Sequence, residues 1–494
     1  MTLHELYLLS PEISMALLAG VIIILDLIFK NKKLLPIVGF IGLLVPLFFS
    51  ISLTNADPNN TGFYSALIVD KFSLFFKYLI IFAVAIVLLI SIEFGKKFGK
   101  IQGEYYSLVL LSASGMLLLV SATELITIYI ALELTALPTA ALAAFGRNGR
   151  SSESGLKFLL LSAISSAILL YGMVLTYGFT GTTYLPEIVV RIQEMIGTSE
   201  NILDSGALLF GIILITAGFG FKISAVPFQM WAPDVYEGAP TPITGFLSVA
   251  SKAAGFAIIL RIFYSAFDIT AITVDWSSLV AILSAISMSV GNLVAIRQQN
   301  IKRMLAYSTI AQAGYIMVGL AALSTLPGGQ DHAGPAGILF YLAGYAMTNL
   351  AAFAVITAVA NNNGGDESIS SFGGLLKRSP TLTAIMTLSM ISLIGIPPTV
   401  GFMAKIYIFG SAMDTGLEWL AIIGVINSVI SAYYYLRVVK VMFSESDSAL
   451  NTKLTPEFGT YTAAIVGFIG TFIFGIYPTP IIDLAQTAIK SIML

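Results

Sequence analysis

Residues 218–255 read GFGFKISAVPFQMWAPDVYEGAPTPITGFLSVASKAAG. The segment lies within apolar sequence long enough to cross a bilayer, yet it contains Lys222, Lys252 and the helix-breaking Pro227. An uncompensated charge at the bilayer centre costs about 2.5–3.5 kcal/mol on insertion scales. Proline removes a backbone donor, so carbonyl groups of the preceding turn need another partner. The stretch therefore predicts a membrane helix that is interrupted beside a buried lysine, next to protein or cavity water.

The composition of the whole chain indicates an integral membrane protein. Of its 494 residues, 57% are hydrophobic and 11% are charged, the mean hydropathy is +0.90 and the net charge is −2. Soluble domains are about one quarter charged. The chain has no cysteine, which excludes disulfides, thiolate metal sites and iron–sulfur ligation by this chain. Its two histidines, His4 and His332, lie in polar segments, which argues against haem ligation, and the net charge gives no attraction to nucleic acid.

Apolar segments predict an all-α polytopic membrane protein with about 14 transmembrane helices. The N-terminus lacks a basic segment, so we expect the first apolar run to be a retained span. The alternating pattern of a membrane barrel is absent from the sequence. The predicted spans lie near 11–29, 34–54, 72–93, 105–122, 124–146, 156–180, 206–230, 241–264, 276–296, 302–323, 335–361, 382–412, 417–442 and 459–478.

The distribution of Lys and Arg predicts the orientation of these spans. Most of the basic residues lie in or beside every second loop, starting with the first: Lys30, Lys32, Lys33, Lys96, Lys97, Lys100, Arg147, Arg150, Arg297, Lys302, Arg303, Lys377, Arg378, Arg437, Lys440 and Lys453. The opposite set of loops holds at most Lys71, Lys77, Arg191, Arg261 and Lys490. Because cytoplasmic loops carry an excess of Lys and Arg, we expect the first loop in the cytoplasm and both termini outside.

One predicted cytoplasmic loop departs from this pattern, because it contains Asp234 and Glu237 and no basic residue. Thr241 as an N-cap and Pro242 at the first helical position predict a tight connection into the next span. The alternative is an acidic site that attracts protons or contacts another subunit.

Four ionisable residues lie deep in the predicted spans: Glu133, Lys222, Lys252 and Lys405. Together they would cost roughly 10 kcal/mol without compensation. A rise of about 1.5 Å per residue places the first three at a similar depth. One interpretation is a structural ion pair between helices. The other is a proton path, because a buried lysine can gain and lose a proton as a carboxylate moves, whereas arginine hardly deprotonates. Lys157 lies in the first turn of its span, where its side chain can reach the interface.

The two lysine-bearing spans with Gly and Pro interruptions are five spans apart, and they predict an internal repeat. The interrupting residues are Gly218, Gly220 and Pro227 in span seven and Gly395, Pro397, Pro398 and Gly401 in span twelve. An odd spacing makes the copies inverted five-helix repeats, with broken helices 7 and 12. We expect a three-helix segment at 1–104, one repeat at 105–264 (spans 4–8), the second at 276–442 (spans 9–13), and span 14 within 443–494. Ordinary proline kinks are the alternative.

Uncharged polar side chains are frequent in the second half. They include Ser308, Thr309, Gln312, Tyr315, Tyr345, Thr348, Asn349, Asn427, Ser428, Ser431 and Tyr433 to Tyr435. Such groups commonly form hydrogen bonds between membrane helices. They could also hold waters between Lys252 and Lys405.

Three motifs give the chain a family resemblance: 131–142 (ALELTALPTAAL), 227–255 (PFQMWAPDVYEGAPTPITGFLSVASKAAG) and 297–320 (RQQNIKRMLAYSTIAQAGYIMVGL). They resemble the antiporter-like subunit N of proton-pumping NADH:quinone oxidoreductase, the bacterial complex I. The resemblance runs nearly end to end and includes the loop SSFGGLLKRSP at 370–380.

The resemblance implies a proton-translocating membrane subunit that couples quinone reduction elsewhere in the complex to proton transfer through buried Lys, Glu and waters. It implies that Glu133 pairs with Lys222, that Lys252 is the central lysine, that Lys405 lies toward the periplasmic side, and that Lys157 lies near the site of proton uptake. No cofactor is expected in this chain; FMN, iron–sulfur clusters and quinone belong to partner subunits. The implied partners are the other membrane and peripheral subunits and lipid, in the bacterial inner membrane.

Two other classes of function remain open. The multisubunit sodium–proton antiporters share this fold, so cation exchange without redox partners is one alternative. A purely structural scaffold subunit is the other, although four buried charges in matched halves argue against it.

Overall fold

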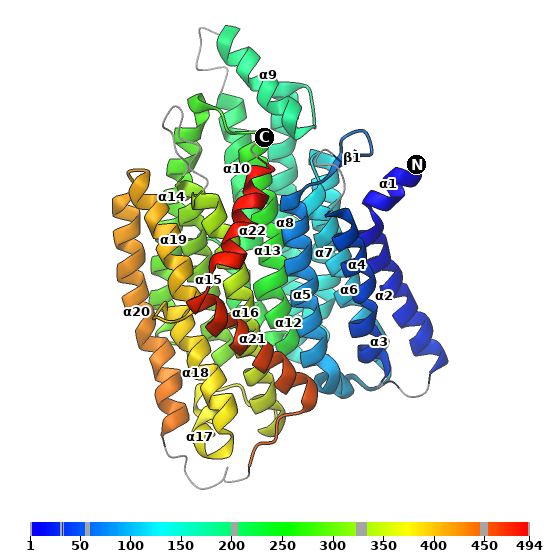
Figure 1. The fold of residues 1–494 in the computed structure, drawn as a ribbon, viewed down its shortest axis with the longest axis vertical. Helices are drawn as coiled ribbons and strands as arrows, with labels where there is room; N and C mark the ends of the chain where they lie inside the picture. Colours follow the sequence, from blue (N-terminus) through cyan, green and yellow to red (C-terminus); the bar gives the residue numbers. More distant parts are fainter. Residues whose placement is uncertain are drawn as a thin grey trace.

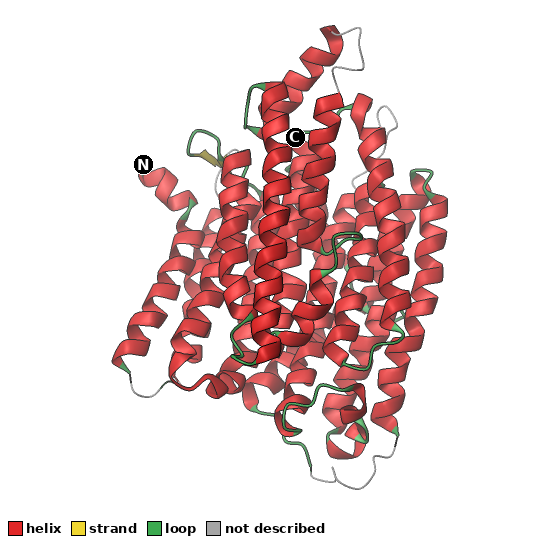
Figure 2. Ribbon diagram, turned by 180° about the vertical axis from the view of Figure 1, so that it is seen from behind, coloured by secondary structure: helices red, strands yellow, loops and turns green. Residues whose placement is uncertain are grey.

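The computed structural model describes residues 2–29, 32, 34–54, 60–198, 206–322, 333–444 and 453–492. Lys30, Lys33 and His332 lie outside these residues. The chain forms a bundle of helices whose connecting loops gather at its two ends (Figure 2). Twelve helices in the described part of the chain are long and apolar enough to cross a membrane. The predicted all-α polytopic fold is therefore confirmed.

The first half of the bundle runs from the N-terminal helices to the interrupted region around residue 225 (Figure 1). Its elements are α1 (Leu3–Leu8), α2 (Ser10–Ile28), α3 (Leu34–Gly42), α4 (Leu44–Leu53), the antiparallel strands β1 (Asn60–Gly62) and β2 (Leu67–Val69), α5 (Lys71–Phe94), the 3-10 turn η1 (Gly95–Ile101), α6 (Gln102–Ser121), α7 (Leu125–Ala143), α8 (Gly149–Thr180), α9 (Leu185–Thr198), α10 (Gly206–Ile223) and α11 (Trp231–Gly238).

The second half starts with the helical segments that lead into Lys252. Its elements are α12 (Thr241–Phe246), the π-helical turn η3 (Leu247–Ser251), α13 (Lys252–Ser265), α14 (Thr270–Ala295), α15 (Ile301–Ala321), α16 (Ala333–Asn362), η4 (Ile369–Phe372), α17 (Leu375–Arg378), α18 (Pro380–Ile394), α19 (Val400–Asp414), α20 (Glu418–Phe443), α21 (Phe458–Ile476) and α22 (Thr479–Lys490).

The predicted interruptions of spans seven and twelve are present. Span seven ends as α10 at Ile223, and α11 follows only at Trp231. Span twelve is divided into α18 and α19, each of 15 residues. α5, of 24 residues, and α6, of 20 residues, are separate helices that pack against each other; the chain turns between them in η1, where Gly99 has a φ of 59°. The number of 14 crossings and the inverted repeat stay predictions.

Side-chain caps fix where the site-bearing helices begin. Asp70 accepts a hydrogen bond from the Ser73 backbone at 2.7 Å and begins α5, and Asn148 does the same for Ser151 at the start of α8. Asn300 caps α15 through the Arg303 backbone. Each cap satisfies one of the backbone donors that a helix leaves unpaired in its first turn.

The helix α16 lies at the centre of the bundle. It packs against helices from both halves, namely α5, α12, α15, α18, α19, α21 and α22. In the most apolar 18-residue segment of α16, 94% of the residues are buried. In the corresponding segment of the peripheral helix α8, 28% are buried. The outer helices instead expose large apolar side chains such as Leu160, Ile164 and Val429. Large apolar side chains on the outer surface of the bundle suit a protein that is surrounded by lipid.

Two buried ion pairs correct the prediction that only four ionisable residues lie deep in the spans. Lys77 Nζ lies 2.7 Å from Glu12 Oε1, and both side chains are buried between α5 and α2. Arg261 of α13 binds both carboxylate oxygens of Asp70, at 2.9 and 3.0 Å. Lys77 and Arg261, counted at most with the opposite loops, lie inside α5 and α13, as the predicted spans 72–93 and 241–264 place them, and each is paired with an acid from a distant segment.

Candidate functional site

Lys222 lies in the last turn of α10, directly before the interruption in span seven. Side chains satisfy the backbone groups that the interruption leaves without helical partners. The Trp231 indole donates to the Phe221 carbonyl at 2.9 Å, and the Val226 backbone donates to Ser287 Oγ at 2.9 Å. The helix end next to Lys222 is thus held in place by groups from α11 and α14.

A cavity of about 30 Å³ adjoins Lys222. On the side of α8 it is lined by three hydroxyl groups, those of Ser162, Ser165 and Ser166. A close approach of α8 and α10 brings these serines within reach, because a Cβ atom at Gly172 would lie 2.8 Å from the Gly211 carbonyl oxygen. In the described part of the chain, Lys222 has no ion pair within 4 Å. Its ammonium group therefore adjoins a small polar cavity instead of a fixed counter-ion.

Glu133 of α7 is the acid predicted to pair with Lys222. No ion pair joins the two side chains among the described residues. Glu133 is half-buried, and its buried Oε1 has no hydrogen-bond partner in the described structure. The structure thus brings the predicted pair into the same region without joining it directly.

Lys252 is the first residue of α13, directly after the π-helical turn η3. Its Nζ donates to the backbone carbonyl oxygen of Thr309 at 2.7 Å, and its side chain is buried. Gly255, three residues further along α13, lies against Lys222: a Cβ atom there would be 3.2 Å from Lys222 Cγ. Residues three apart share a helix face. Lys222 therefore packs against the face of α13 that carries Lys252, and the two lysines lie at a similar depth, as predicted.

Lys405 of α19 binds the carbonyl groups at the end of α18. Its Nζ donates to the oxygen atoms of Ile394 at 2.7 Å and Leu393 at 3.2 Å. In a continuous helix these two carbonyls would accept from the residues four positions later, which are Pro398 and Pro397. Proline has no backbone N–H. The two prolines therefore create the pair of acceptors that holds the lysine.

The rest of the Lys405 environment is polar or aromatic. Ser428 Oγ of α20 accepts a third hydrogen bond from Nζ at 3.0 Å. The Tyr315 ring lies under the ammonium group, with 4.3 Å between Nζ and the ring centroid. Such a cation–π contact contributes about 2 kcal/mol when it is removed from water. Lys405 is thus stabilised as an ammonium without any carboxylate partner among the described residues.

A polar connection extends from Lys252 to Lys405. Thr309, whose carbonyl binds Lys252, has its hydroxyl 2.9 Å from Tyr345 OH. Tyr345 lines a cavity of about 10 Å³ together with Gln312 and Leu393. Leu393 in turn accepts a hydrogen bond from Lys405. The structure therefore brings together the polar residues that the sequence predicts between the two lysines.

Lys157 belongs to a different environment, an ion-pair network at the end of the bundle. Its Nζ lies 2.6 Å from Asp234 Oδ2 and 2.7 Å from Glu153 Oε1, and its side chain is 40% exposed. Arg303 of α15 binds Asp234 at 2.7 Å and Glu237 at 2.9 Å. Burial opposes ionisation of Asp234, but hydrogen bonds from Lys157 and Arg303 outweigh this effect and hold the pKa of its carboxyl below the ordinary value.

The acidic loop is thus neutralised by bases from α8 and α15, and a cavity of about 170 Å³ lies among these charges. One detail of the sequence prediction is wrong. Thr241 is the first residue of α12 and not its N-cap, and its hydroxyl donates to Glu367 Oε1 at 2.8 Å.

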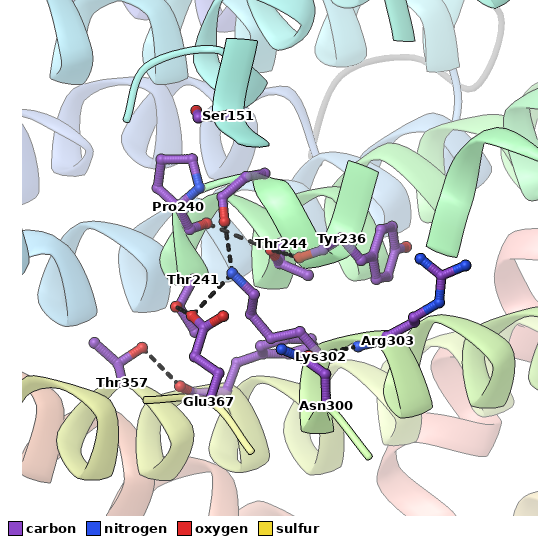
Figure 3. A network of polar contacts seen from close by, with 12 residues as sticks. Ser151, Tyr236, Pro240, Thr241, Thr244, Asn300, Lys302, Arg303, Thr357 and Glu367 are labelled. Atoms are coloured by element: carbon purple, nitrogen blue, oxygen red, sulfur yellow. Dashed lines mark hydrogen bonds and ion pairs between the residues drawn. The ribbon is translucent and has the colours of Figure 1, made fainter. Parts of the chain in front are cut away.

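Sequence reasoning missed a buried cluster around Lys302, which Figure 3 shows. The sequence predicts Lys302 beside a loop, at the start of span ten. Its Nζ lies 2.9 Å from Glu367 Oε1 and 2.7 Å from the Ala239 carbonyl oxygen, and its side chain is 3% exposed. The cluster joins the N-terminal ends of α12 and α15 to the segment after α16. Nothing local in the sequence indicates it, because Glu367 is far from Lys302 along the chain.

Two interrupted helices, each beside a buried lysine, within a bundle of apolar helices define a polytopic membrane protein of the ion-translocating class. Residues 122–431 match the family model described as NADH:quinone oxidoreductase/Mrp antiporter, TM. The NADH-quinone oxidoreductase subunit N of Heliobacterium modesticaldum is 41% identical over 98% of this chain and 99% of that protein. Its counterpart in Dehalococcoides mccartyi is 42% identical, again over 98% and 99%. The chain belongs to the family of NADH-quinone oxidoreductase subunit N, and the resemblance seen in the sequence is confirmed.

Solved structures support the same assignment. A chain of respiratory complex I from Thermus thermophilus with bound aureothin matches with a TM-score of 0.78 and 28% identity, covering 96% of this chain and 99% of that one. A chain of an archaeal membrane-bound sulfane sulfur reductase matches with a TM-score of 0.83 and 25% identity, over 100% and 98%. A chain of the Mrp complex from Dietzia sp., with a TM-score of 0.83, 20% identity and full coverage of both chains, shows a shared fold.

Proposed function

We propose that this chain is the proton-translocating, antiporter-like membrane subunit of an NADH:quinone oxidoreductase. Quinone reduction elsewhere in the complex would drive proton transfer through its buried lysines. The observation that carries the proposal is the connection from Lys252 through Thr309, Tyr345 and a polar cavity to Lys405. A scaffold would not need three buried lysines without a carboxylate at ion-pair distance.

Each predicted residue has a role in this proposal. Protons are taken up near Lys157 and Lys222, pass through Lys252 and waters, and leave beyond Lys405. Glu133 modulates Lys222, because a nearby carboxylate that is not paired with the lysine can move toward or away from it. The cavity between α8 and Lys222, with its three serine hydroxyls, supplies room and hydrogen bonds for water on the uptake side.

The partners follow from the family. Related chains occur in respiratory complex I and in another respiratory membrane complex, so this chain assembles with other membrane and peripheral subunits. No cluster of metal-ligating residues occurs among the residues that the structure describes. We assign FMN, iron–sulfur clusters and quinone to those partners. The Lys and Arg distribution supports a bacterial inner-membrane location with both termini on the periplasmic side.

The experiment is NADH-driven proton pumping by the complex in sealed vesicles, with the Glu133→Ala and Lys222→Ala variants. We expect both variants to assemble and to pump more slowly than the native complex. Full pumping by both variants would refute the assigned roles.

Sodium–proton exchange is the second candidate, because the Mrp chain shares the fold. The identity of about two residues in five with subunit N proteins favours the first function. Sodium-driven proton exchange in vesicles that lack the redox subunits would support the second.

A further inference from the structure

Gln312 of α15 is buried beside the carbonyl group that Lys405 binds. Its Nε2 donates to the Leu393 oxygen at 3.1 Å, the same atom that accepts from Lys405 Nζ at 3.2 Å. A carbonyl oxygen only accepts, so this contact determines which end of the Gln312 amide carries the nitrogen. Tyr341 OH donates to the other end, Oε1. Gln312 is therefore held in one orientation, with an N–H directed at Leu393.

The contacts of Lys405 are complete for its protonated form. An ammonium group has three N–H donors, and Nζ has three oxygen acceptors, on Leu393, Ile394 and Ser428. A neutral amine keeps two N–H groups and gains a lone pair, so one of the three contacts has to end when the proton leaves. Of the two carbonyls, that of Leu393 is farther from Nζ and has a second donor in Gln312.

The backbone cannot supply a new donor to the Leu393 oxygen if Lys405 leaves it, because the residue four positions later is Pro397, which has no N–H. Without Gln312, loss of the Lys405 contact would leave a buried carbonyl unpaired, and such groups are rare in proteins. With Gln312 present, Lys405 can leave this oxygen while the oxygen keeps a hydrogen bond.

We propose that Gln312 is a positioning residue that keeps the Leu393 carbonyl hydrogen-bonded while Lys405 alternates between ammonium and amine. This inference rests on the proposed function, in which Lys405 releases a proton. The proton leaves Nζ for the polar groups or waters on the release side, the N–H bond electrons remain on nitrogen as the lone pair, and Gln312 itself is never ionised.

A structural role is the competing explanation. Gln312 also lies 3.4 Å from Tyr435 OH, which is hydrogen-bonded to Ser308, one turn earlier on α15. If Gln312 only fastened helices together, removing the neighbouring Ser308 hydroxyl should have a comparable effect, and the effect should not depend on pH.

The test uses the whole complex in sealed vesicles with Gln312→Met, which keeps the side-chain length and removes the hydrogen bonds. We expect roughly tenfold slower proton translocation at neutral pH, the factor that corresponds to one lost hydrogen bond, with recovery as the pH is raised because alkaline medium favours proton loss. Ser308→Ala, the matched control, should stay within about twofold of the native rate and keep its pH profile.

Native rates in Gln312→Met, or rates that are reduced equally at every pH, would overturn the inference. If Gln312→Met does not assemble, Gln312→Glu serves instead. A carboxylate at position 312 would hold Lys405 as an ammonium and slow translocation further. A native rate in Gln312→Glu would also overturn the inference. Lys405→Ala separates the two proposals. If it pumps normally, the proposed function fails, whereas if it stops pumping and both Gln312 variants behave as native, only the role of Gln312 fails.

Discussion

Lys252 binds the backbone carbonyl of Thr309, at 2.7 Å, and no carboxylate lies within ion-pair distance of it among the described residues. Asp70 and Arg261 show the opposite arrangement, two full charges joined by a pair of hydrogen bonds. A carbonyl dipole stabilises an ammonium group less than a carboxylate does, so the proton on Lys252 is held less firmly. Lys222 and Lys405 likewise have no carboxylate at ion-pair distance among the described residues, whereas the buried Lys77 is paired with Glu12. The structure thus distinguishes lysines that can exchange protons from bases that hold helices together.

Replacing Lys405 by arginine should stop proton translocation. Lys405→Arg keeps a positive charge and hydrogen-bond donors, but a guanidinium hardly deprotonates, so the release step fails. We expect less than about one tenth of the native pumping rate in sealed vesicles. Lys490→Arg, at the exposed end of α22, is the control and should pump normally. Native pumping by Lys405→Arg would show that this lysine does not titrate during turnover.

Replacing Gly255 by a larger residue should displace the Lys222 side chain without removing any polar group. A Cβ atom at this position would lie 3.2 Å from both Lys222 Cγ and Ile223 Cγ2. We expect Gly255→Val to displace the Lys222 side chain and to slow pumping about tenfold, since small misplacements of a reacting group are costly. Gly410→Ala in α19, where nothing lies within 4 Å of the added atom, is the matched control. Equal pumping rates in the two variants would argue against a role for the position of Lys222.

Breaking the Asp70–Arg261 pair should mainly destabilise the protein. Arg261→Met leaves a buried carboxylate without its partner, which costs about 3–5 kcal/mol. The thermal unfolding temperature of the purified subunit complex should fall accordingly. Arg191→Met removes an exposed pair and should change stability by less than about 0.5 kcal/mol. The double change Asp70→Asn with Arg261→Met should be less harmful than Arg261→Met alone, and an additive loss would contradict a coupled pair.

The ion pairs of Asp234 should stabilise the fold at neutral pH and lose this effect in acid. Its folded-state pKa is lowered, so the contribution is complete above the ordinary carboxyl value of about 3.9 and disappears as the pH falls through the lower folded value. We therefore expect Asp234→Asn to unfold at a lower temperature than the native chain at pH 7. The two unfolding temperatures should converge below about pH 4. A constant difference over this range would mean that the carboxylate charge is not what stabilises the loop.

Residue chemistry along the chain was enough to predict the class of fold and the interrupted helices. Pro397 and Pro398 predict the end of a helix within this apolar segment, and Lys405 follows them in the same predicted span. The same reasoning failed for Lys77 and Lys302. Both stand near predicted loops, and their acids, Glu12 and Glu367, come from segments that only the tertiary structure brings close.

The sequence also gave no sign of the π-helical turn before Lys252, because residues 247–251 are ordinary helix formers or small polar residues. Such turns are rare and occur mostly as single turns inside α-helices, frequently at functional sites. Likewise, the polar residues of α15 and α16 were predicted to hydrogen-bond or to hold water, but the shared carbonyl of Leu393 depends on how α18 approaches Gln312.

The central position of α16 has a consequence for biogenesis. This helix is delivered to the membrane before α18, α19, α21 and α22, which later surround it, have been synthesised. Until they arrive, Thr348 lacks the hydroxyl partners that Ser392 of α18 and Thr471 of α21 supply. Tyr345 and Asn349, in contrast, bind Thr309 and Ser248, which belong to elements made before α16. One face of the central helix therefore gains its protein partners only when the last quarter of the chain has been inserted.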